Sequence, residues 1–198
     1  SQNDGIEAMI DYVKDTRTQF SSFDPAPDHT GITVIFIANC QFYFNTGSSH
    51  YLILTSRADI LTFAENNIAY NEMSVATLQA ISVKSIYLEY CNFTHNDAGL
   101  TISQAYLTVM NRVWLKGTRF AAALTVSHSD AIYCSRSEFD ENRAGAINLY
   151  SIGELYVKDS RFENNRVLES NGAAISAILG VDQVITILES AFSLNDAL

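Results

Sequence analysis

Residues 159–165 read DSRFENN, with a large apolar residue, Phe162, followed three positions later by Asn165. The same order returns along the chain in the stretches NCQFYFN (39–45), YCNFTHN (90–96), RSEFDEN (136–142) and ESAFSLN (189–195). A pattern that returns at a nearly constant distance indicates a repeat protein, in which one structural unit stacks on the next.

The large apolar residue, called the anchor from here on, defines seven copies of the repeat. The anchors are Phe42, Ile68, Phe93, Phe120, Phe139, Phe162 and Phe192, separated by 26, 25, 27, 19, 23 and 30 residues. Three residues after the anchor, the fourth copy has Ala123 and the other six copies have asparagine, namely Asn45, Asn71, Asn96, Asn142, Asn165 and Asn195.

Each copy also contains alternating apolar residues that are typical of β-strands. Seven and five residues before the anchors stand the pairs Ile35/Ile37, Leu61/Phe63, Ile86/Leu88, Val113/Leu115, Ile132/Cys134, Leu155/Val157 and Ile185/Ile187. Side chains two residues apart lie on one face of a strand, so every copy has an inward face. A second alternating pair follows the asparagine, for example Ile147 and Leu149.

No copy can bury its inward face alone, but stacked coils bury it against each other at the strand spacing of about 4.8 Å. The 3.6-residue period of helices is absent from the repeats, which excludes a helical solenoid. The sequence therefore predicts an all-β, right-handed parallel β-helix solenoid of about seven coils over residues 31–198. An asparagine amide both donates and accepts hydrogen bonds, so the repeated asparagines predict a stacked asparagine ladder, and we expect them to take the left-handed backbone conformation at the bends.

The motif resembles the parallel β-helix repeat of the pectin-lyase-like superfamily. The resemblance is carried by FDEN (139–142) with AGAI (144–147), and by FENN (162–165) with GAAI (172–175). In pattern it is similar to the polymorphic outer-membrane proteins of the autotransporter type and to large surface proteins of ciliates. The resemblance implies the fold, whereas function depends on the site that a chain carries on that fold.

Residues 1–30 do not repeat. Asp4 followed by Glu7 is typical of the start of a helix, and the apolar residues Ile6, Met9, Ile10 and Val13 lie on one helical face. We expect a short helix and connector that cap the open end of the solenoid, or else a tail that packs elsewhere. Because the chain ends inside a repeat, just after Asn195, we expect the β-helix to continue in a longer parent protein.

Composition excludes several classes of function. A formal net charge of −10 argues against a nucleic-acid partner, and no apolar run is long enough to span a membrane. The four histidines fall at unrelated repeat positions, so no metal site, catalytic triad or cofactor is predicted. Cys40 and Cys91 share a column two coils apart, about 9–10 Å by strand spacing, which is beyond disulfide reach. With Cys134 on the inward face, all three cysteines are expected to be buried free thiols.

Two groups of outward residues are candidate sites. Lys158, Arg136, Asp159 and Glu189 are charged residues on neighbouring coils, and we interpret them as surface charges rather than as a catalytic constellation. Six residues before the anchors, the column between the two inward residues contains five aromatic residues: Phe36, Tyr87, Trp114, Tyr133 and Tyr156. This aromatic stripe either stabilises the sheet by cross-strand stacking or binds a glycan or a protein.

Asn92-Phe93-Thr94 is the single N-glycosylation sequon, with Asn92 expected to point outward. Taken together, the sequence predicts a non-catalytic structural or adhesive segment of a large extracellular or cell-surface protein. Such a segment would be a rigid spacer that presents the aromatic stripe to a glycan, a protein neighbour or other copies of itself in a filament. The alternative is a fragment of a carbohydrate-active enzyme, either a polysaccharide lyase or a hydrolase.

Overall fold

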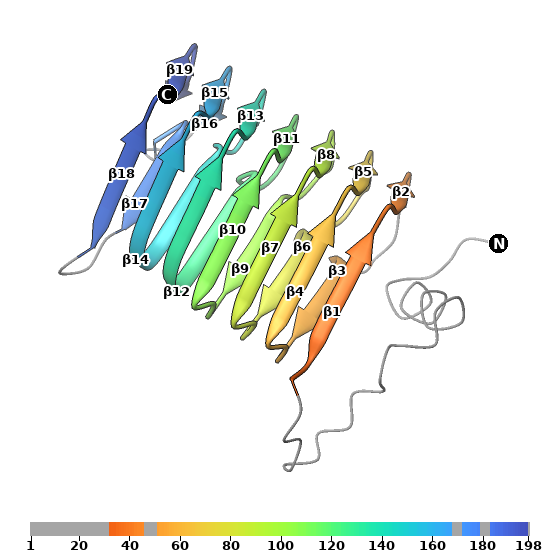
Figure 1. Cartoon of the computed structure of the whole chain (residues 1–198). Helices are drawn as coiled ribbons and strands as arrows, with labels where there is room; N and C mark the ends of the chain where they lie inside the picture. Colours follow the sequence, from red (N-terminus) through yellow and green to blue (C-terminus); the bar gives the residue numbers. More distant parts are fainter. Residues whose placement is uncertain (1–31, 46–50, 168–171, 179–182, 198) are drawn as a thin grey trace.

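A computed structural model describes residues 32–45, 51–167, 172–178 and 183–197. The chain is an all-β parallel solenoid of about six turns, which confirms the predicted fold class. In Figure 1 it climbs through the front strands, crosses the short strands and descends behind, so that it advances along the axis with a right-handed path. The predicted capping helix within residues 1–30 lies outside the described residues.

Strands from successive coils form three rows, and all pairings between them are parallel. The front row consists of β1 (Val34–Ala38), β4 (Ile60–Ala64), β7 (Ser85–Glu89), β10 (Leu107–Asn111), the second halves of β12 (Leu124–Ser135) and β14 (Ile147–Lys158), and β18 (Val184–Leu188). A small sheet follows, with β2 (Gln41–Tyr43), β5 (Asn67–Ala69), β8 (Asn92–Thr94), β11 (Trp114–Lys116), β13 (Glu138–Asp140), β15 (Arg161–Glu163) and β19 (Ala191–Ser193).

The back row consists of β3 (Tyr51–Ser56), β6 (Ala76–Ile81), β9 (Leu100–Ser103), the first halves of β12 and β14, and β17 (Ile175–Ile178). Because β12 and β14 run through both rows, the front and back rows join into one eleven-stranded sheet. A final short pair, β16 (Arg166–Val167) and β20 (Asp196–Ala197), connects the last two coils. The seven strands of the small sheet mark seven passes of the chain, separated by about six turns.

The core is a set of stacked columns of like side chains. Phe139 lies directly below Phe162, with ring centroids 4.8 Å apart and planes 2° apart, and Phe162 stacks on Phe192 at 4.7 Å. Phe93, Phe139 and Phe162 are all buried, as their role as anchors requires. Aromatic rings in parallel strands can stack face to face because the coils repeat at about the strand spacing of 4.8 Å.

The fourth copy has a different register from the one that the sequence pattern predicted. Leu115, not Phe120, pairs with Phe93 and Phe139 and is the fourth anchor, while Phe120 is 78% exposed. The anchor spacings of this coil are therefore 22 and 24 residues rather than 27 and 19. The prediction was wrong because Phe120 has the residue type of an anchor, so the pattern placed Ala123 as the fourth residue of the asparagine column. At the true positions this coil has Leu115 and Thr118 in place of Phe and Asn.

Two consequences follow from the corrected register. The inward pair of the fourth coil is Thr108 and Met110, both fully buried, and Thr108 departs from the apolar pattern. Val113 and Leu115 are buried as well, but they belong to the bend and to the small sheet.

In the part of the chain that the structure describes, residues in the left-handed backbone region mark three bends of the coil. The bend between the front row and the small sheet holds Asn39, Glu65, Tyr90, Arg112, Arg136, Asp159 and Glu189, with φ between 49° and 55°. The bend after the small sheet holds Phe44, Tyr70, His95, Gly117, Glu141, Asn164 and Leu194, and the bend after the back row holds Arg57, Ser82, Gln104, His128 and Ser151. The ladder asparagines are not among them, so our expectation of their backbone conformation was wrong: the residue before each of them makes the turn.

Asparagines after the small sheet form a ladder in two runs. Within each run, the Oδ1 of one asparagine accepts hydrogen bonds from both the backbone N–H and the Nδ2 of the asparagine in the preceding coil, over 2.7–3.3 Å. Nδ2 also donates to the carbonyl of the preceding anchor. The runs are Asn45–Asn71–Asn96 and Asn142–Asn165–Asn195, and Thr118 interrupts them where Ala123 had been predicted to stand.

A second polar ladder, which the sequence pattern did not reveal, occupies the bend before the small sheet. The Asn66 Oδ1 accepts from the Cys40 N–H at 2.9 Å, and the hydroxyls of Ser137, Ser160 and Ser190 accept in the same way from the preceding coil over 3.1–3.2 Å. Small polar residues in this column were visible in the sequence. Their role as hydrogen-bond acceptors could not be predicted, because it depends on the direction of the backbone N–H groups, which at this bend point along the solenoid axis.

Candidate functional site

Aromatic side chains on the outward face of the front row form the first candidate site. Strand register gives the column as Phe36, Thr62, Tyr87, Val109, Tyr133, Tyr156 and Thr186. Four of the five predicted stripe residues therefore share one column, and the corrected register puts Val109 where Trp114 was expected. We call these seven residues the aromatic column.

Tyr133 and Tyr156 are the contacting pair within the aromatic column. Their ring centroids lie 5.9 Å apart with planes tilted by 43°, and Tyr133 is 37% exposed. The Tyr133 hydroxyl donates a hydrogen bond of 3.3 Å to Glu154, whose negative charge raises the pKa of Tyr133. A tyrosine combines an apolar ring with a polar hydroxyl, which is why tyrosine is enriched at binding interfaces.

Trp114 lies on the small sheet instead of in the aromatic column. Its register partners are Asn92 and Glu138, and the ring is 40% exposed. Together with Thr94 and Lys116, these residues line a shallow hollow. The sequon residue Asn92 is half-exposed and faces outward beside the tryptophan, as the sequence predicted for its side chain.

A charged cluster adjoins this hollow. Lys116 Nζ lies 2.6 Å from Asp140 Oδ2 and 3.2 Å from Glu141 Oε1. Burial alone would raise the pKa of Asp140, but hydrogen bonds from Lys116 and Asn164 outweigh it and hold the pKa below its ordinary value. The hydrogen bond to Asp140 raises the pKa of Lys116. Both groups are thereby held in their charged forms, as in a structural ion pair.

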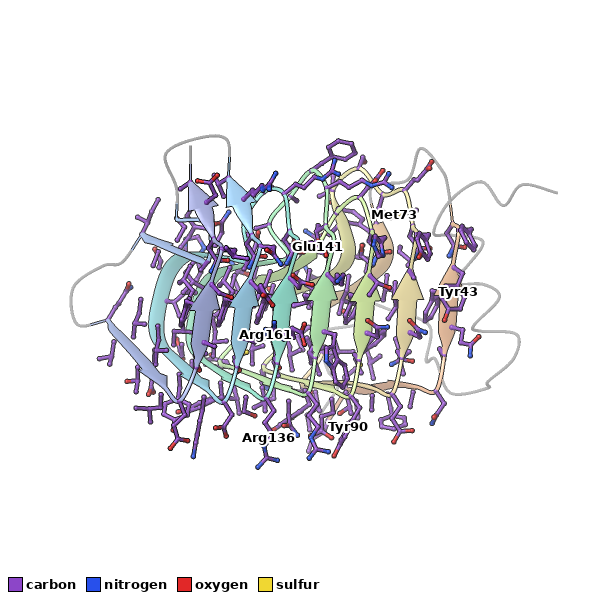
Figure 2. All side chains as sticks on the ribbon, turned by 90° about the horizontal axis from the view of Figure 1, so that it is seen from above. Tyr43, Met73, Tyr90, Arg136, Glu141 and Arg161 are labelled. Carbon is purple, nitrogen blue, oxygen red and sulfur yellow. The ribbon has the colours of Figure 1, made fainter. Side chains whose placement is uncertain are left out.

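The predicted charged group at the neighbouring bend is spread along the surface. Lys158 Nζ lies 3.6 Å from Glu189 Oε2, and both side chains are largely exposed, whereas Arg136 and Asp159 occupy left-handed bend positions on adjacent coils. Figure 2 shows Arg136 and Tyr90 projecting beyond the edge where the strands of the small sheet begin. Within the described residues, no three His, Cys, Asp or Glu side chains are placed so that they could hold a metal ion.

All three cysteines are free thiols. Cys91 and Cys134 are fully buried as predicted, but the prediction was wrong for Cys40, which lies in the first described coil and is half-buried. Burial raises the pKa of Cys134 to about 11, which keeps it protonated and unreactive at neutral pH.

Comparison of the chain with models of protein families, with curated proteins and with solved structures found no match. In the part of the chain that the structure describes, no helix is long and apolar enough to cross a lipid bilayer.

Proposed function

We propose that this chain is a non-catalytic structural or adhesive segment of a large extracellular or cell-surface protein. It acts as a rigid spacer, and the aromatic column is the face with which it binds a glycan or a protein neighbour. The relation to the pectin-lyase-like superfamily, with its autotransporter-type and ciliate members, is part of the same proposal and rests on the repeat motif.

The single observation that carries the proposal is the exposed, in-register aromatic column on a tightly packed solenoid. Tyr133 and Tyr156 keep their rings accessible although each has a strand neighbour that could cover it. A core of stacked side chains together with two polar ladders restrains bending and twisting, so the residues of the column are held at a regular spacing along the solenoid. Preorganised aromatic side chains bind with little loss of conformational entropy.

The enzyme alternative has less support. A general acid at neutral pH needs a carboxyl group with a raised pKa, whereas among the described residues the carboxyl groups with a shifted pKa, Asp59 and Asp140, are both held ionised by lysines. Incubating the protein with pectate and alginate tests the alternative directly. Release of unsaturated or reducing ends that is lost on Asp159→Ala would replace the spacer proposal with a lyase or hydrolase.

The binding face is tested by the double variant Tyr133→Thr/Tyr156→Thr. Threonine retains strand propensity and occurs naturally in this column at Thr62 and Thr186, so the fold should survive. We expect binding on a glycan array, or self-association measured by sedimentation velocity, to fall about tenfold or more, because exposed aromatic residues dominate interface energies.

A matched control is Tyr106→Thr/Tyr150→Thr, which removes two exposed tyrosines outside the aromatic column. This control should bind as the wild type does. Equal losses in both double variants, or no loss in the column variant, would show that the aromatic column is not the binding face.

A further inference from the structure

Arginines from three successive coils form one column at the bend where the small sheet ends. Arg119, Arg143 and Arg166 each follow the ladder residue of their own coil. Their backbone N–H groups donate to the carbonyls of the preceding ladder residues, Asn96, Thr118 and Asn142, over 3.3, 2.8 and 2.8 Å. Successive members are therefore about one strand spacing, roughly 4.8 Å, apart along the backbone. This row of cations lies on a chain whose formal net charge is −10.

Two of these arginines form no ion pair within the described residues, although Asp196 is the register partner of Arg166 on the neighbouring strand. The third, Arg119, forms an ion pair with Asp97, with Nη1 lying 3.3 Å from Oδ1. Arg143 and Arg166 are exposed, and within the described residues neither has an ion pair or a side-chain hydrogen bond. Like charges side by side on neighbouring strands destabilise a sheet, so this pair attracts an anion.

The three arginines form one side of a groove. Its other side consists of residues one position before the ladder: His95, Gly117, Glu141 and Asn164. Figure 2 shows Glu141 beyond the edge where the small-sheet strands end, on the opposite side from Arg136.

The His95 imidazole packs closely against Gly117 in the lining of the groove. A Cβ at Gly117 would lie 3.0 Å from His95 Cδ2 and 3.4 Å from His95 Nε2, so the glycine makes room for the imidazole. On the other side of the imidazole, the buried Nδ1 has no hydrogen-bond partner. The carboxylate of Glu141, the single acidic residue lining the groove, is engaged by Lys116 at 3.2 Å.

We propose that this groove binds an oxyanion, in the form of a phosphate or sulfate monoester, held between Arg143 and Arg166. A guanidinium group presents a planar fork of N–H donors that matches two oxygens of a tetrahedral anion. A phosphate monoester carries about −1.5 to −2 charges at neutral pH, which balances two arginines, whereas a sulfate monoester carries a single negative charge shared between them. The site lies at a bend of the solenoid, separate from the aromatic column, and goes beyond the proposed spacer function.

The same column favours a compact anion over a long anionic polymer. Glu72 and Asp97 precede the arginines in this column, and Asp196 follows them. A polymer laid along the solenoid axis would bring its charges against these carboxylates at both ends of the row. One compact anionic group placed between two arginines avoids that repulsion.

Calorimetric titration with inorganic phosphate, and in parallel with inorganic sulfate, tests the site at neutral pH and at constant ionic strength. We expect saturable binding of at least one anion, weakened about tenfold or more in Arg143→Gln/Arg166→Gln. Glu141→Gln, which removes the one carboxylate lining the groove, should tighten binding. Preference for phosphate assigns the ligand as a phosphate ester, and equal or stronger binding of sulfate assigns it as a sulfate ester.

The matched control is Arg57→Gln/Arg136→Gln, which removes the same net charge from exposed arginines at the two other bends. It should leave the affinity unchanged, and thermal melting should show that both double variants are folded. Three outcomes overturn the proposal: binding of neither anion to the wild type, equal weakening in the control, or binding of a long polyanion such as heparin alone.

Discussion

Replacing Asn142 by alanine tests how much the asparagine ladder stabilises the solenoid. The Asn142 side chain is fully buried and makes three hydrogen bonds. Oδ1 accepts from the Thr118 N–H at 3.0 Å, while Nδ2 donates to the Leu115 carbonyl at 3.0 Å and to Asn165 Oδ1 at 2.9 Å. Asn165 Oδ1 keeps the Asn142 backbone N–H as a donor at 3.3 Å, and the strand register leaves the Leu115 carbonyl paired with the Asp140 N–H, so the change leaves one backbone group, the Thr118 N–H, unpaired.

A buried backbone N–H without a partner costs about 1–3 kcal/mol, which is the loss of stability expected here. We expect urea unfolding of Asn142→Ala to show a free energy of unfolding lower by this amount, with unchanged dependence on denaturant concentration. The control is Asn148→Ala, because the half-exposed Asn148 side chain makes no hydrogen bond among the described residues and its loss should cost less than about 0.5 kcal/mol. Equal stability of the two variants would refute the role assigned to the ladder.

Three further predictions follow from the corrected register and from the ion pair. Thr118→Asn should complete the ladder and stabilise the protein by about 1 kcal/mol, because the new amide can reach the Phe93 carbonyl and the N–H of the preceding asparagine; a lower melting temperature would contradict this. Leu115→Ala should destabilise by about 2–5 kcal/mol and Phe120→Ala by less than about 0.5 kcal/mol, and the reverse order would restore the register predicted from sequence. Since the folded-state pKa of Asp140 lies below its ordinary value of 3.8, the stability lost in Asp140→Asn should be constant at neutral pH and should shrink as pH falls below 3.8; a gap that widens in acid would contradict the assignment.

The sequence predicted the solenoid because its information repeats. Phe139 and Phe162, each followed by an asparagine, occur at the same place in two successive repeats, and stacking of the coils brings them into one column. A single ambiguous coil defeated the pattern. Phe120 resembles an anchor more than Leu115 does, and only the irregular spacings of 27 and 19 residues signalled the error.

The register error in the fourth coil also obscured part of the aromatic column and part of the arginine column. It moved Trp114 into the aromatic stripe, although the residue lies on the small sheet between Asn92 and Glu138. In the mistaken register Arg119 stood next to an anchor, so its alignment with Arg143 could not be recognised. Surface columns depend on register alone, since no burial pattern constrains the residue type at an outward position.

The left-handed bends were hidden for a different reason. Residues as different as Glu65, Tyr90 and Arg136 occupy equivalent bend positions, and each donates its N–H to the next coil, which offsets the backbone cost. A signal did exist. Among the described residues, none of those in the left-handed region is a valine, isoleucine or threonine, the residues for which this conformation is most strained.

The account of a rigid spacer with in-register surface columns is tested most directly by one distance across the solenoid. Thr62 and Thr186 occupy the aromatic column five coils apart, and strand register predicts a backbone separation of about 24 Å. Spin labels at these two positions, in a protein with Cys40, Cys91 and Cys134 replaced by alanine, allow measurement by pulsed electron–electron resonance. The account predicts one narrow distribution centred near that separation once the label length is included. A broad distribution, or a narrow one centred far from this value, would contradict it.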